Sequence, residues 1–211
     1  MSDTLTFYTN PMSRGRIARW MLEEVGAPYE TVVLDFGTTM KAPEYLAINP
    51  MGKVPAIKHG GTVVTEAAAI CAYLADAFPE ANLAPSHGDK ARGPYYRWMF
   101  FAAGPVEAAV TAKSLGLLAP ADKAGMAGYG NFESVMDALE RAVSESPFIC
   151  GEQFTAADVY VGSQIGWGLM FGTIDKRRAF IDYAARVQAR PAYIRAGEKD
   201  DALIPKDQPA G

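Results

Sequence analysis

The chain has 211 residues, of which 49% are hydrophobic and 21% are charged, as is typical of a water-soluble globular protein with one or two domains. Its net charge is −4 and no run of Lys or Arg stands out, which argues against a nucleic-acid partner. No apolar stretch reaches the roughly 18 residues that a membrane span needs, and the N-terminus lacks the pattern of a signal peptide.

Cysteine and histidine are scarce in this sequence. Cys71 and Cys150 lie far apart and neither has a CxxC partner, which argues against a disulfide framework and for a reducing compartment. The two histidines, His59 and His87, are too few for a histidine-based metal site. We therefore expect a cytoplasmic protein that holds no metal.

The first 34 residues predict a strand, a helix and a second strand. Residues 4–8 are β-branched and aromatic, as in a strand. Ser13 then has the character of a helix N-cap, and apolar residues at helical spacing occupy positions 17–25 before Gly26. Residues 29–34 supply the second strand. A strand, a helix and a strand in about thirty residues form a βαβ unit, whose strands are parallel.

A hairpin and a further helix complete this half of the chain. Residues 54–58 and 62–65 are strand-like and are joined by His-Gly-Gly, which predicts a β-hairpin. A short helix is expected at residues 43–46, and a longer one runs from residue 65 to the residue before Pro79. The predicted order is βαβαββα, which matches a thioredoxin-like domain.

Strand signals disappear after a stretch rich in Pro and Gly, so we expect two domains. The predicted boundaries are residues 1–80 for the α/β domain, 81–88 for a linker and 89–211 for an all-helical bundle domain. Helices are expected over residues 89–118, with a break at Gly104-Pro105, over 121–144, from a capping box at Thr155 and Asp158, and over 174–189.

Residues 49–57 place a proline at the entry of the third predicted strand. Pro55 cannot donate to a sheet ladder, so the N–H and C=O of Val54 are left to face a ligand. Such an edge could bind an extended peptide as though it were another strand. The alternative is an ordinary proline at a strand entry, and this stretch alone leaves both interpretations open.

Ser13 and Glu66 each begin a predicted helix, where anions are favoured. A thioredoxin enzyme would carry a CxxC near Ser13, and its absence argues strongly against dithiol exchange. A serine hydroxyl can instead donate to a ligand's thiolate, a bond of roughly 1.5–3 kcal/mol that would lower a thiol pKa from about 8.5 to roughly 6.5–7. Glu66 could bind an ammonium group, while the N–H groups of Glu66 and Ala67 hold a carboxylate. Alternatively, both residues could act only on their helices, Ser13 as a cap and Glu66 as a carboxylate stabilised by the helix dipole.

Four motifs together resemble the cytosolic glutathione S-transferase superfamily. Residues 49–55 read Asn-Pro-Met-Gly-Lys-Val-Pro, and residues 65–74 read Thr-Glu-Ala-Ala-Ala-Ile-Cys-Ala-Tyr-Leu. Residues 154–158 read Phe-Thr-Ala-Ala-Asp, and residues 190–193, Arg-Pro-Ala-Tyr, resemble the end of the family's core helices. The chain looks like a bacterial-type member. Because Ser13, and not a cysteine, stands where the family's serine and cysteine classes place the activating residue, the resemblance implies a serine-dependent enzyme.

The resemblance implies a glutathione-binding thioredoxin-like domain, a helical domain that contributes the pocket for a small hydrophobic electrophile, and a homodimer. Pro55 would be the family's cis-proline, and Val54 would pair with the cysteinyl backbone of glutathione. Glu66 and Ala67 would hold the γ-glutamyl group, and Lys53 would reach the glycine carboxylate. The implied reaction is conjugation of glutathione to the electrophile, a detoxification reaction.

Two positions depart from the family's pattern or stay ambiguous. Ala67 stands where Ser or Thr is common, which removes a hydroxyl contact of about 1 kcal/mol. Ser13 is favoured as the residue that activates the thiol, with Tyr8 at the end of the first strand as the runner-up. The alternatives are a glutathione-dependent isomerase or lyase and a catalytically weak binding protein.

Overall fold

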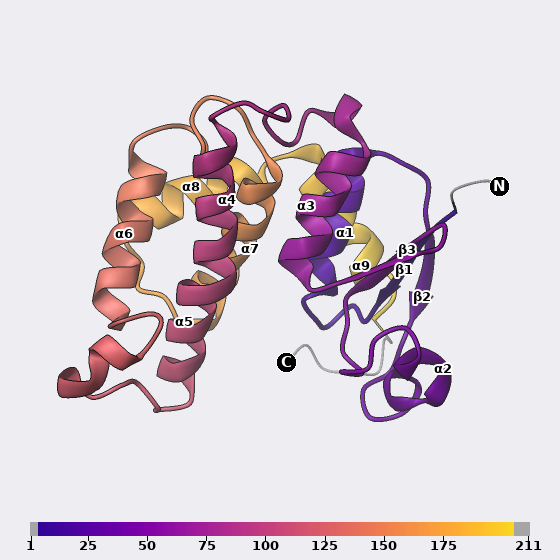
Figure 1. The fold of residues 1–211 in the computed structure, drawn as a ribbon, viewed down its shortest axis with the longest axis horizontal. Helices are drawn as coiled ribbons and strands as arrows, with labels where there is room; N and C mark the ends of the chain where they lie inside the picture. The colour runs from indigo at the N-terminus through magenta and orange to yellow at the C-terminus, as the bar shows by residue number, and fades with distance from the viewer. Residues whose placement is uncertain (1–3, 205–211) are drawn as a thin grey trace. The chain divides into compact units, whose positions relative to one another are not determined.

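A four-stranded mixed sheet lies in the N-terminal part of the chain in the computed structural model, which describes residues 4–204 (Figure 1). Its strands are β1 (Leu5–Thr9), β2 (Glu30–Val33), β3 (Ala56–His59) and β4 (Thr62–Thr65). The order is β2-β1-β3-β4, with β1 and β2 parallel and β3 antiparallel to both of its neighbours. The βαβ unit and the hairpin predicted from the sequence are confirmed.

The helices of this part follow the predicted order. They are α1 (Gly15–Val25), α2 (Pro43–Leu46) and α3 (Ala67–Ala77), with 3₁₀ turns at Thr39–Lys41 and Pro79–Ala81. Helices α1 and α3 pack against each other. Helix α1 buries Ile17, Met21 and Leu22 because its apolar residues recur at helical spacing. Tyr45 of α2 belongs to a separate apolar cluster, which also contains Leu34, Met40 and Ala56. The thioredoxin-like fold is thereby confirmed.

Helix α1 begins later than the sequence predicts. Arg14, not Ser13, occupies the N-cap position, and its side chain makes no capping hydrogen bond. Ser13 lies in a preceding turn, where its N–H donates to the carbonyl oxygen of Asn10 at 3.2 Å. The amide oxygen of Asn10 in turn accepts from Met12 N at 2.9 Å. This turn is built around Asn10 and delays the helix, so the prediction of Ser13 as N-cap is wrong.

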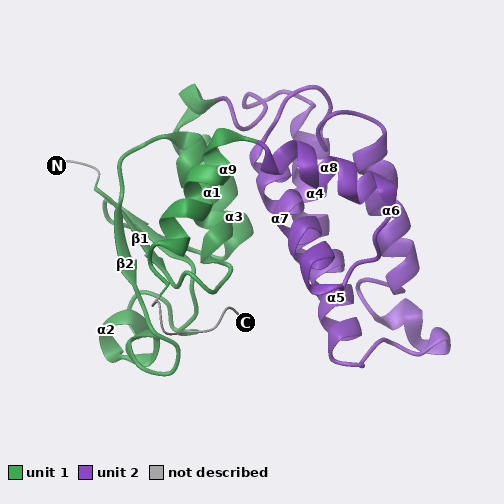
Figure 2. Ribbon diagram, turned by 180° about the vertical axis from the view of Figure 1, so that it is seen from behind, with its two compact units in different colours: residues 1–81, 190–211 green, residues 82–189 purple. Residues whose placement is uncertain are grey.

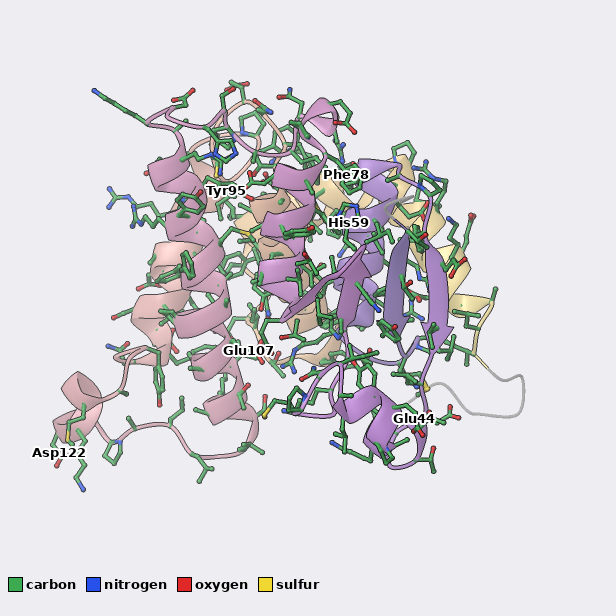
Figure 3. All side chains as sticks on the ribbon, turned by 45° about the vertical axis from the view of Figure 1, so that its right-hand side comes forward. Glu44, His59, Phe78, Tyr95, Glu107 and Asp122 are labelled. Carbon is green, nitrogen blue, oxygen red and sulfur yellow. The ribbon has the colours of Figure 1, made fainter. Side chains whose placement is uncertain are left out.

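His59, at the end of β3, packs among aromatic side chains. Its ring stacks on Phe78 with 5.5 Å between centroids, and its Nδ1 lies 3.0 Å from the hydroxyl of Tyr73 (Figure 3). Among residues 4–204, no three His, Cys, Asp or Glu side chains gather in a way that could hold a metal ion.

The contacts divide the chain into two compact units, residues 1–81 with 190–211 and residues 82–189 (Figure 2). Helix α9 (Pro191–Asp201) therefore belongs to the first unit, and it packs along α1. The sequence analysis instead placed residues 89–211 in one helical domain. In the structure α8 ends at Gln188 and Pro191 opens α9, a position that proline favours.

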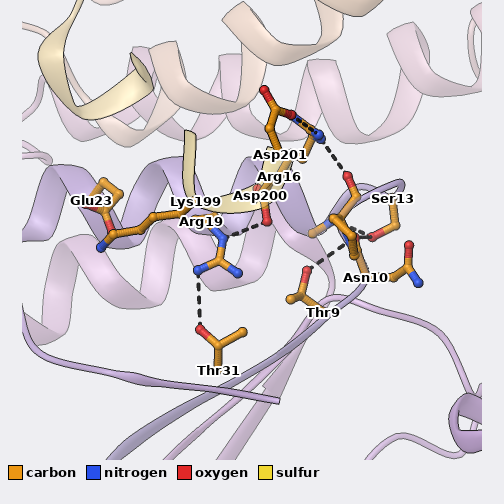
Figure 4. Close-up of polar contacts among 12 residues, drawn as sticks. Thr9, Asn10, Ser13, Arg16, Arg19, Glu23, Thr31, Lys199, Asp200 and Asp201 are labelled. Atoms are coloured by element: carbon orange, nitrogen blue, oxygen red, sulfur yellow. Dashed lines mark hydrogen bonds and ion pairs between the residues drawn. The ribbon is translucent and has the colours of Figure 1, made fainter. Parts of the chain in front are cut away.

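Ion pairs join α9 to α1 (Figure 4). Arg19 Nε donates to Asp200 Oδ1 at 2.7 Å, and both side chains are buried. Arg190 donates to both carboxylate oxygens of Glu24, each at 2.7 Å. Breaking a buried pair by removing one partner is strongly destabilising, so the Arg19–Asp200 pair fixes α9 to this unit.

Glu23 of α1 makes the stability of this contact depend on pH. Burial of Glu23 raises its pKa, but hydrogen bonds from Lys199, Tyr29 and Arg195 outweigh burial, and the net pKa is lowered from 4.5. The stabilising contribution is therefore present above pH 4.5 and is lost as the pH falls through the folded-state pKa.

We expect Lys199→Gln to lower the free energy of unfolding by about 0.5–1 kcal/mol at pH 7, because the pair is half-exposed on the lysine side. The difference from wild type should vanish below the folded-state pKa of Glu23. Urea unfolding of both proteins over a series of pH values from pH 7 downward measures this. Lys58→Gln, which removes an exposed charge of β3, is the control, and an equal loss in that variant would contradict the assignment.

The second unit, residues 82–189, is helical throughout its regular structure. Its elements are α4 (Arg92–Phe101), the π-helix η3 (Ala102–Val106), α5 (Glu107–Ser114), the 3₁₀ helix η4 (Ala121–Met126), α6 (Phe132–Ser144), α7 (Ala156–Phe171) and α8 (Arg178–Gln188). The break predicted at Gly104-Pro105 appears as the π-helix. The helix predicted over residues 121–144 is wrong for residues 127–131, where Gly130 adopts a positive φ of 66°.

Helix α7 begins with the predicted capping box. The backbone N–H of Thr155 donates to Asp158 Oδ2 at 2.8 Å. Asp158 is fully buried and also accepts from Ile149 N and from the hydroxyl of Tyr183, both at 2.7 Å. This one carboxylate thus joins α7 to α8 and to the loop before α7. No helix within residues 4–204 is long and apolar enough to cross a bilayer.

Candidate active site

The register of the sheet brings three predicted site segments together at one end of its strands, called here the site edge. Tyr8 lies opposite Ala56, and Ala56 lies opposite Thr65. Because β3 is antiparallel to both neighbours, the end of β1, the start of β3 and the end of β4 meet there. Ser13 follows β1, Val54 precedes β3 and Glu66 follows β4.

The backbone of Val54 is unpaired at this edge. The Val54–Pro55 peptide bond is cis, as the resemblance implied, and Pro55 has no N–H. The N–H and C=O of Val54 make no hydrogen bond to any other part of residues 4–204. A donor and an acceptor on the same residue can pair with one residue of an extended peptide.

Side chains brace the loop that carries Val54. The carbonyl oxygen of Lys53 accepts from the hydroxyl of Tyr45 at 2.6 Å and from Asn49 Nδ2 at 2.8 Å. Lys41 Nζ donates to the carbonyl oxygen of Gly52 at 2.7 Å. Burial raises the pKa of Tyr45 to about 12, so its hydroxyl is a neutral donor near pH 7.

Position 52 in this loop requires a glycine. Its φ is 55°, and a Cβ there would lie 2.9 Å from the carbonyl oxygen of Met40. The sequence analysis recognised the loop motif but missed Tyr45 and Lys41 as its supports. No local pattern marks them, because each acts across eight or more residues.

Ser13 is half-buried at the end of β1, beside the start of α1 (Figure 4). Its hydroxyl donates to the carbonyl oxygen of Asn10 at 2.7 Å and accepts from Gly15 N at 2.9 Å. The start of α1 lies close against the end of β1 here, since a Cβ at Gly15 would lie 1.9 Å from Thr9 Oγ1. The proton of Ser13 is therefore engaged by Asn10, and donation to a ligand requires the hydroxyl to rotate.

Tyr8 has an apolar environment. Its ring packs against Tyr45, with 5.6 Å between centroids and 45° between planes, and against the cluster that contains Leu34. Phe7, the next residue in β1, lies instead under the guanidinium of Arg19 on α1. Because neighbouring side chains of a strand point to opposite faces, Tyr8 faces away from α1.

Glu66 is the N-cap of α3 and has an unusual backbone. Its φ is 68° and its ψ is 120°, a region that costs a non-glycine residue about 1–3 kcal/mol. Its carboxylate is exposed, and Ala67 behind it is buried. The first amides of α3 have no acceptor within the helix. Strain of this kind is found at ligand-binding positions.

Neither cysteine is a candidate nucleophile. Cys71 is fully buried in α3, and burial raises its thiol pKa far above the usual value. Burial also raises the pKa of the Cys150 thiol, to about 12, and the charge of Asp158 adds to the effect. Both thiols are protonated at neutral pH, and Cys71 is a core residue.

Of the other predicted residues, Lys53 presents an exposed ammonium group on the same loop as Val54. In the helical unit, Trp98 and Met99 are buried in the core, whereas Phe100, Met170 and Phe171 are exposed.

A thioredoxin-like unit without a dithiol, followed by a helical unit, defines the class of this protein. Its sequence matches the family models described as "Glutathione S-transferase, N-terminal domain" over residues 3–76 and "Glutathione S-transferase, C-terminal domain" over residues 107–167. Together these matches span more than half of the chain. The chain belongs to the glutathione S-transferase family.

Individual relatives agree with this assignment. Glutathione S-transferase hmp2 of Hypomyces subiculosus is 24% identical over 207 residues, which cover 91% of this chain and 97% of that protein. Glutathione S-transferase GstA of Escherichia coli O157:H7 is 28% identical over 151 residues, 69% of this chain and 73% of that protein.

Solved structures extend the likeness to the fold. A glutathione transferase from Methylococcus capsulatus is 28% identical, with a TM-score of 0.78 over 95% of this chain and all (100%) of that one. A sphingomonad glutathione S-transferase solved in complex with glutathione is also 28% identical, with a TM-score of 0.74 over 94% of this chain and 100% of that one.

Proposed function

We propose that this glutathione S-transferase binds glutathione along the edge formed by Val54, Ser13 and Glu66, and joins its sulfur to a small hydrophobic electrophile. The observation that carries the proposal is the unpaired backbone of Val54 on a braced loop. Glutathione is an extended tripeptide, and its cysteinyl N–H and C=O match that donor and acceptor.

Charged groups near Val54 bind the two ends of the glutathione molecule. Glu66 binds the ammonium of the γ-glutamyl group, and the amides of Glu66 and Ala67 hold its carboxylate at the start of α3. Lys53 binds the glycine carboxylate. The sphingomonad relative solved with glutathione supports this choice of ligand.

Ser13 is the proposed donor to the glutathione sulfur. The thiol loses its proton to solvent, the thiolate attacks an electrophilic carbon, and a leaving group departs or the electrophile takes up a proton. To stabilise the thiolate, the hydroxyl exchanges its neutral bond to Asn10 for a charge-assisted one. Since the first contributes about 0.5–1.5 kcal/mol and the second roughly 1.5–3 kcal/mol, the net gain is about 1–1.5 kcal/mol.

The pKa of bound glutathione tests both the function and the residue. Ultraviolet absorbance of the thiolate, followed against pH, should give a bound-state pKa in wild type about one unit below that of free glutathione. In Ser13→Ala that difference should disappear, and the conjugation rate at neutral pH should fall about tenfold. Tyr8→Phe is the control and should behave as wild type.

Each outcome separates the alternatives. A loss in Tyr8→Phe rather than in Ser13→Ala would transfer the role to Tyr8. Binding without any thiolate absorbance would favour the catalytically weak binding protein. A thiolate without conjugation of any electrophile would favour the isomerase or lyase. Family membership further supports a homodimer in the cytoplasm and the use of glutathione as co-substrate, with no metal.

A further inference from the structure

The chain between β1 and α1 makes a β-turn that ends on Ser13. The N–H of Ser13 donates to the carbonyl oxygen of Asn10 at 3.2 Å, which closes the turn. Pro11 stands at the second position of this turn, where proline is favoured. Asn10 stands at the first position, where its side chain accepts from the N–H of Met12 at 2.9 Å. The place of Ser13 therefore depends on what holds this turn.

Two side chains anchor the turn to the rest of the unit (Figure 4). Asn10 Nδ2 donates to the carbonyl oxygen of Leu34, just after β2, at 2.8 Å. Arg16 Nε donates to the carbonyl oxygen of Pro11 at 2.6 Å. The first bond holds the start of the turn and the second holds its middle. A bond from a charged donor is roughly twice as strong as a neutral one, so the Arg16 anchor is the stronger of the two.

Helix α9 holds Arg16 in turn. Arg16 Nη2 donates to Asp201 Oδ1 at 2.6 Å, so one planar guanidinium bonds to both the turn and α9. Asp201 is the last residue of α9, where the helix dipole disfavours a carboxylate, so α9 gains nothing from this charge by itself. The buried Arg19–Asp200 pair fixes α9 to α1 independently of this contact. Asp201 is thus presented to Arg16 from a fixed element.

The position of the Ser13 hydroxyl is set before any ligand binds. Donation to a ligand requires the hydroxyl to turn away from the carbonyl oxygen of Asn10, and this rotation moves only the proton. The oxygen stays where the turn places it, held also by the N–H of Gly15 at 2.9 Å. A catalytic group must be held within about 0.5 Å of its productive position, so a shift of the turn would weaken the bond to sulfur.

We propose that Arg16, tethered to Asp201, is a positioning residue that fixes the carbonyl of Pro11 and thereby the hydroxyl oxygen of Ser13 at the site edge. The inference rests on the proposed transferase function and on the role of Ser13 in it. Arg16 acts here through the backbone and contacts neither substrate. A purely electrostatic role makes the opposite prediction for Asp201, since loss of its negative charge would favour a nearby thiolate.

The pKa of bound glutathione, followed by thiolate absorbance, separates position from charge. In Arg16→Gln this pKa should rise by about half a unit, and conjugation below it should slow about threefold. Arg16→Lys should resemble Arg16→Gln, because an ammonium is a point charge without the guanidinium fork. Asp201→Ala should raise the pKa by less, and should add nothing in the Arg16→Gln background.

Controls distinguish this role from a loss of stability. Only folded protein binds glutathione, so destabilisation alone does not move the bound-state pKa. Asp201 is exposed, and its removal leaves the fold intact. Below the bound-state pKa, the dissociation constant of glutathione should stay within about twofold of wild type in every variant, because the thiol form makes no use of the Ser13 proton. Arg178→Gln, which breaks an exposed pair with Asp182, should match wild type throughout.

An unchanged pKa in Arg16→Gln, with the expected loss in Ser13→Ala, would overturn this inference and leave the proposed function intact. A lowered pKa in Asp201→Ala would also overturn it, because charge would then outweigh position. Weaker binding of the thiol form in Arg16→Gln, without a change in pKa, would make Arg16 a binding residue instead. A wild type without bound thiolate would overturn the proposed function itself and this inference with it.

Discussion

Asp158→Ala is expected to lower the free energy of unfolding by about 3–5 kcal/mol. The carboxylate accepts hydrogen bonds from Ile149 N, Thr155 N, the Thr155 hydroxyl and the Tyr183 hydroxyl, all within a buried site. Alanine leaves these donors unpaired where water does not reach, and each unpaired donor costs about 1–3 kcal/mol before relaxation.

Urea unfolding followed by far-ultraviolet circular dichroism measures this loss. Asp122→Ala is the matched control, because Asp122 is exposed in η4 and its removal should change the midpoint very little. Asp158→Asn should be intermediate, since its carbonyl still accepts but its NH₂ group would face a donor. A midpoint for Asp158→Ala equal to that of the control would show that the capping box adds nothing to stability.

Glu66→Ala is expected to weaken glutathione binding about 10- to 100-fold, because a hydrogen-bonded ion pair with the ligand's ammonium contributes roughly 1.5–3 kcal/mol. Isothermal titration calorimetry gives the dissociation constant. A glutathione analogue without the α-amino group should bind wild type as weakly as glutathione binds the variant. That analogue should lose nothing further when it is tested on Glu66→Ala.

Glu66→Gly separates the side chain from the backbone. Glycine adopts a φ of 68° without strain, so this variant should be more stable than Glu66→Ala by about 1 kcal/mol or more while binding glutathione equally weakly. Wild-type affinity in both variants would remove the Glu66 side chain from the binding site. Restored affinity in Glu66→Gly alone would mean that the backbone, and not the carboxylate, matters.

Local patterns predicted the elements within residues 1–81 well because these elements follow one another directly in the chain. The strands, the hairpin and the position of Val54 before β3 follow from residues within a few positions of one another. Ser13 was misplaced as a helix cap because Asn10 organises a turn that simple capping rules do not include. Glu66 could be proposed as a binding residue from the sequence, but its backbone conformation could not be predicted.

Helix α9 could not be assigned to its unit from sequence. The Arg19–Asp200 pair joins residues 181 positions apart, and neither residue carries a local sign of its partner. The same holds within the helical unit for Glu107 and Gln164, whose side chains are hydrogen-bonded across 57 positions. What the sequence could not supply is long-range pairing of polar side chains, because hydrophobic periodicity reports only on which face is buried.

The braces on residues 49–54 have a consequence for the thermodynamics of binding. Ordering one residue of a mobile loop costs about 1–2 kcal/mol of conformational entropy. Here the hydroxyl of Tyr45, the amide of Asn49 and the ammonium of Lys41 already hold the loop. The edge at Val54 is thus preorganised, and the entropy lost when glutathione binds is chiefly that of the flexible tripeptide itself.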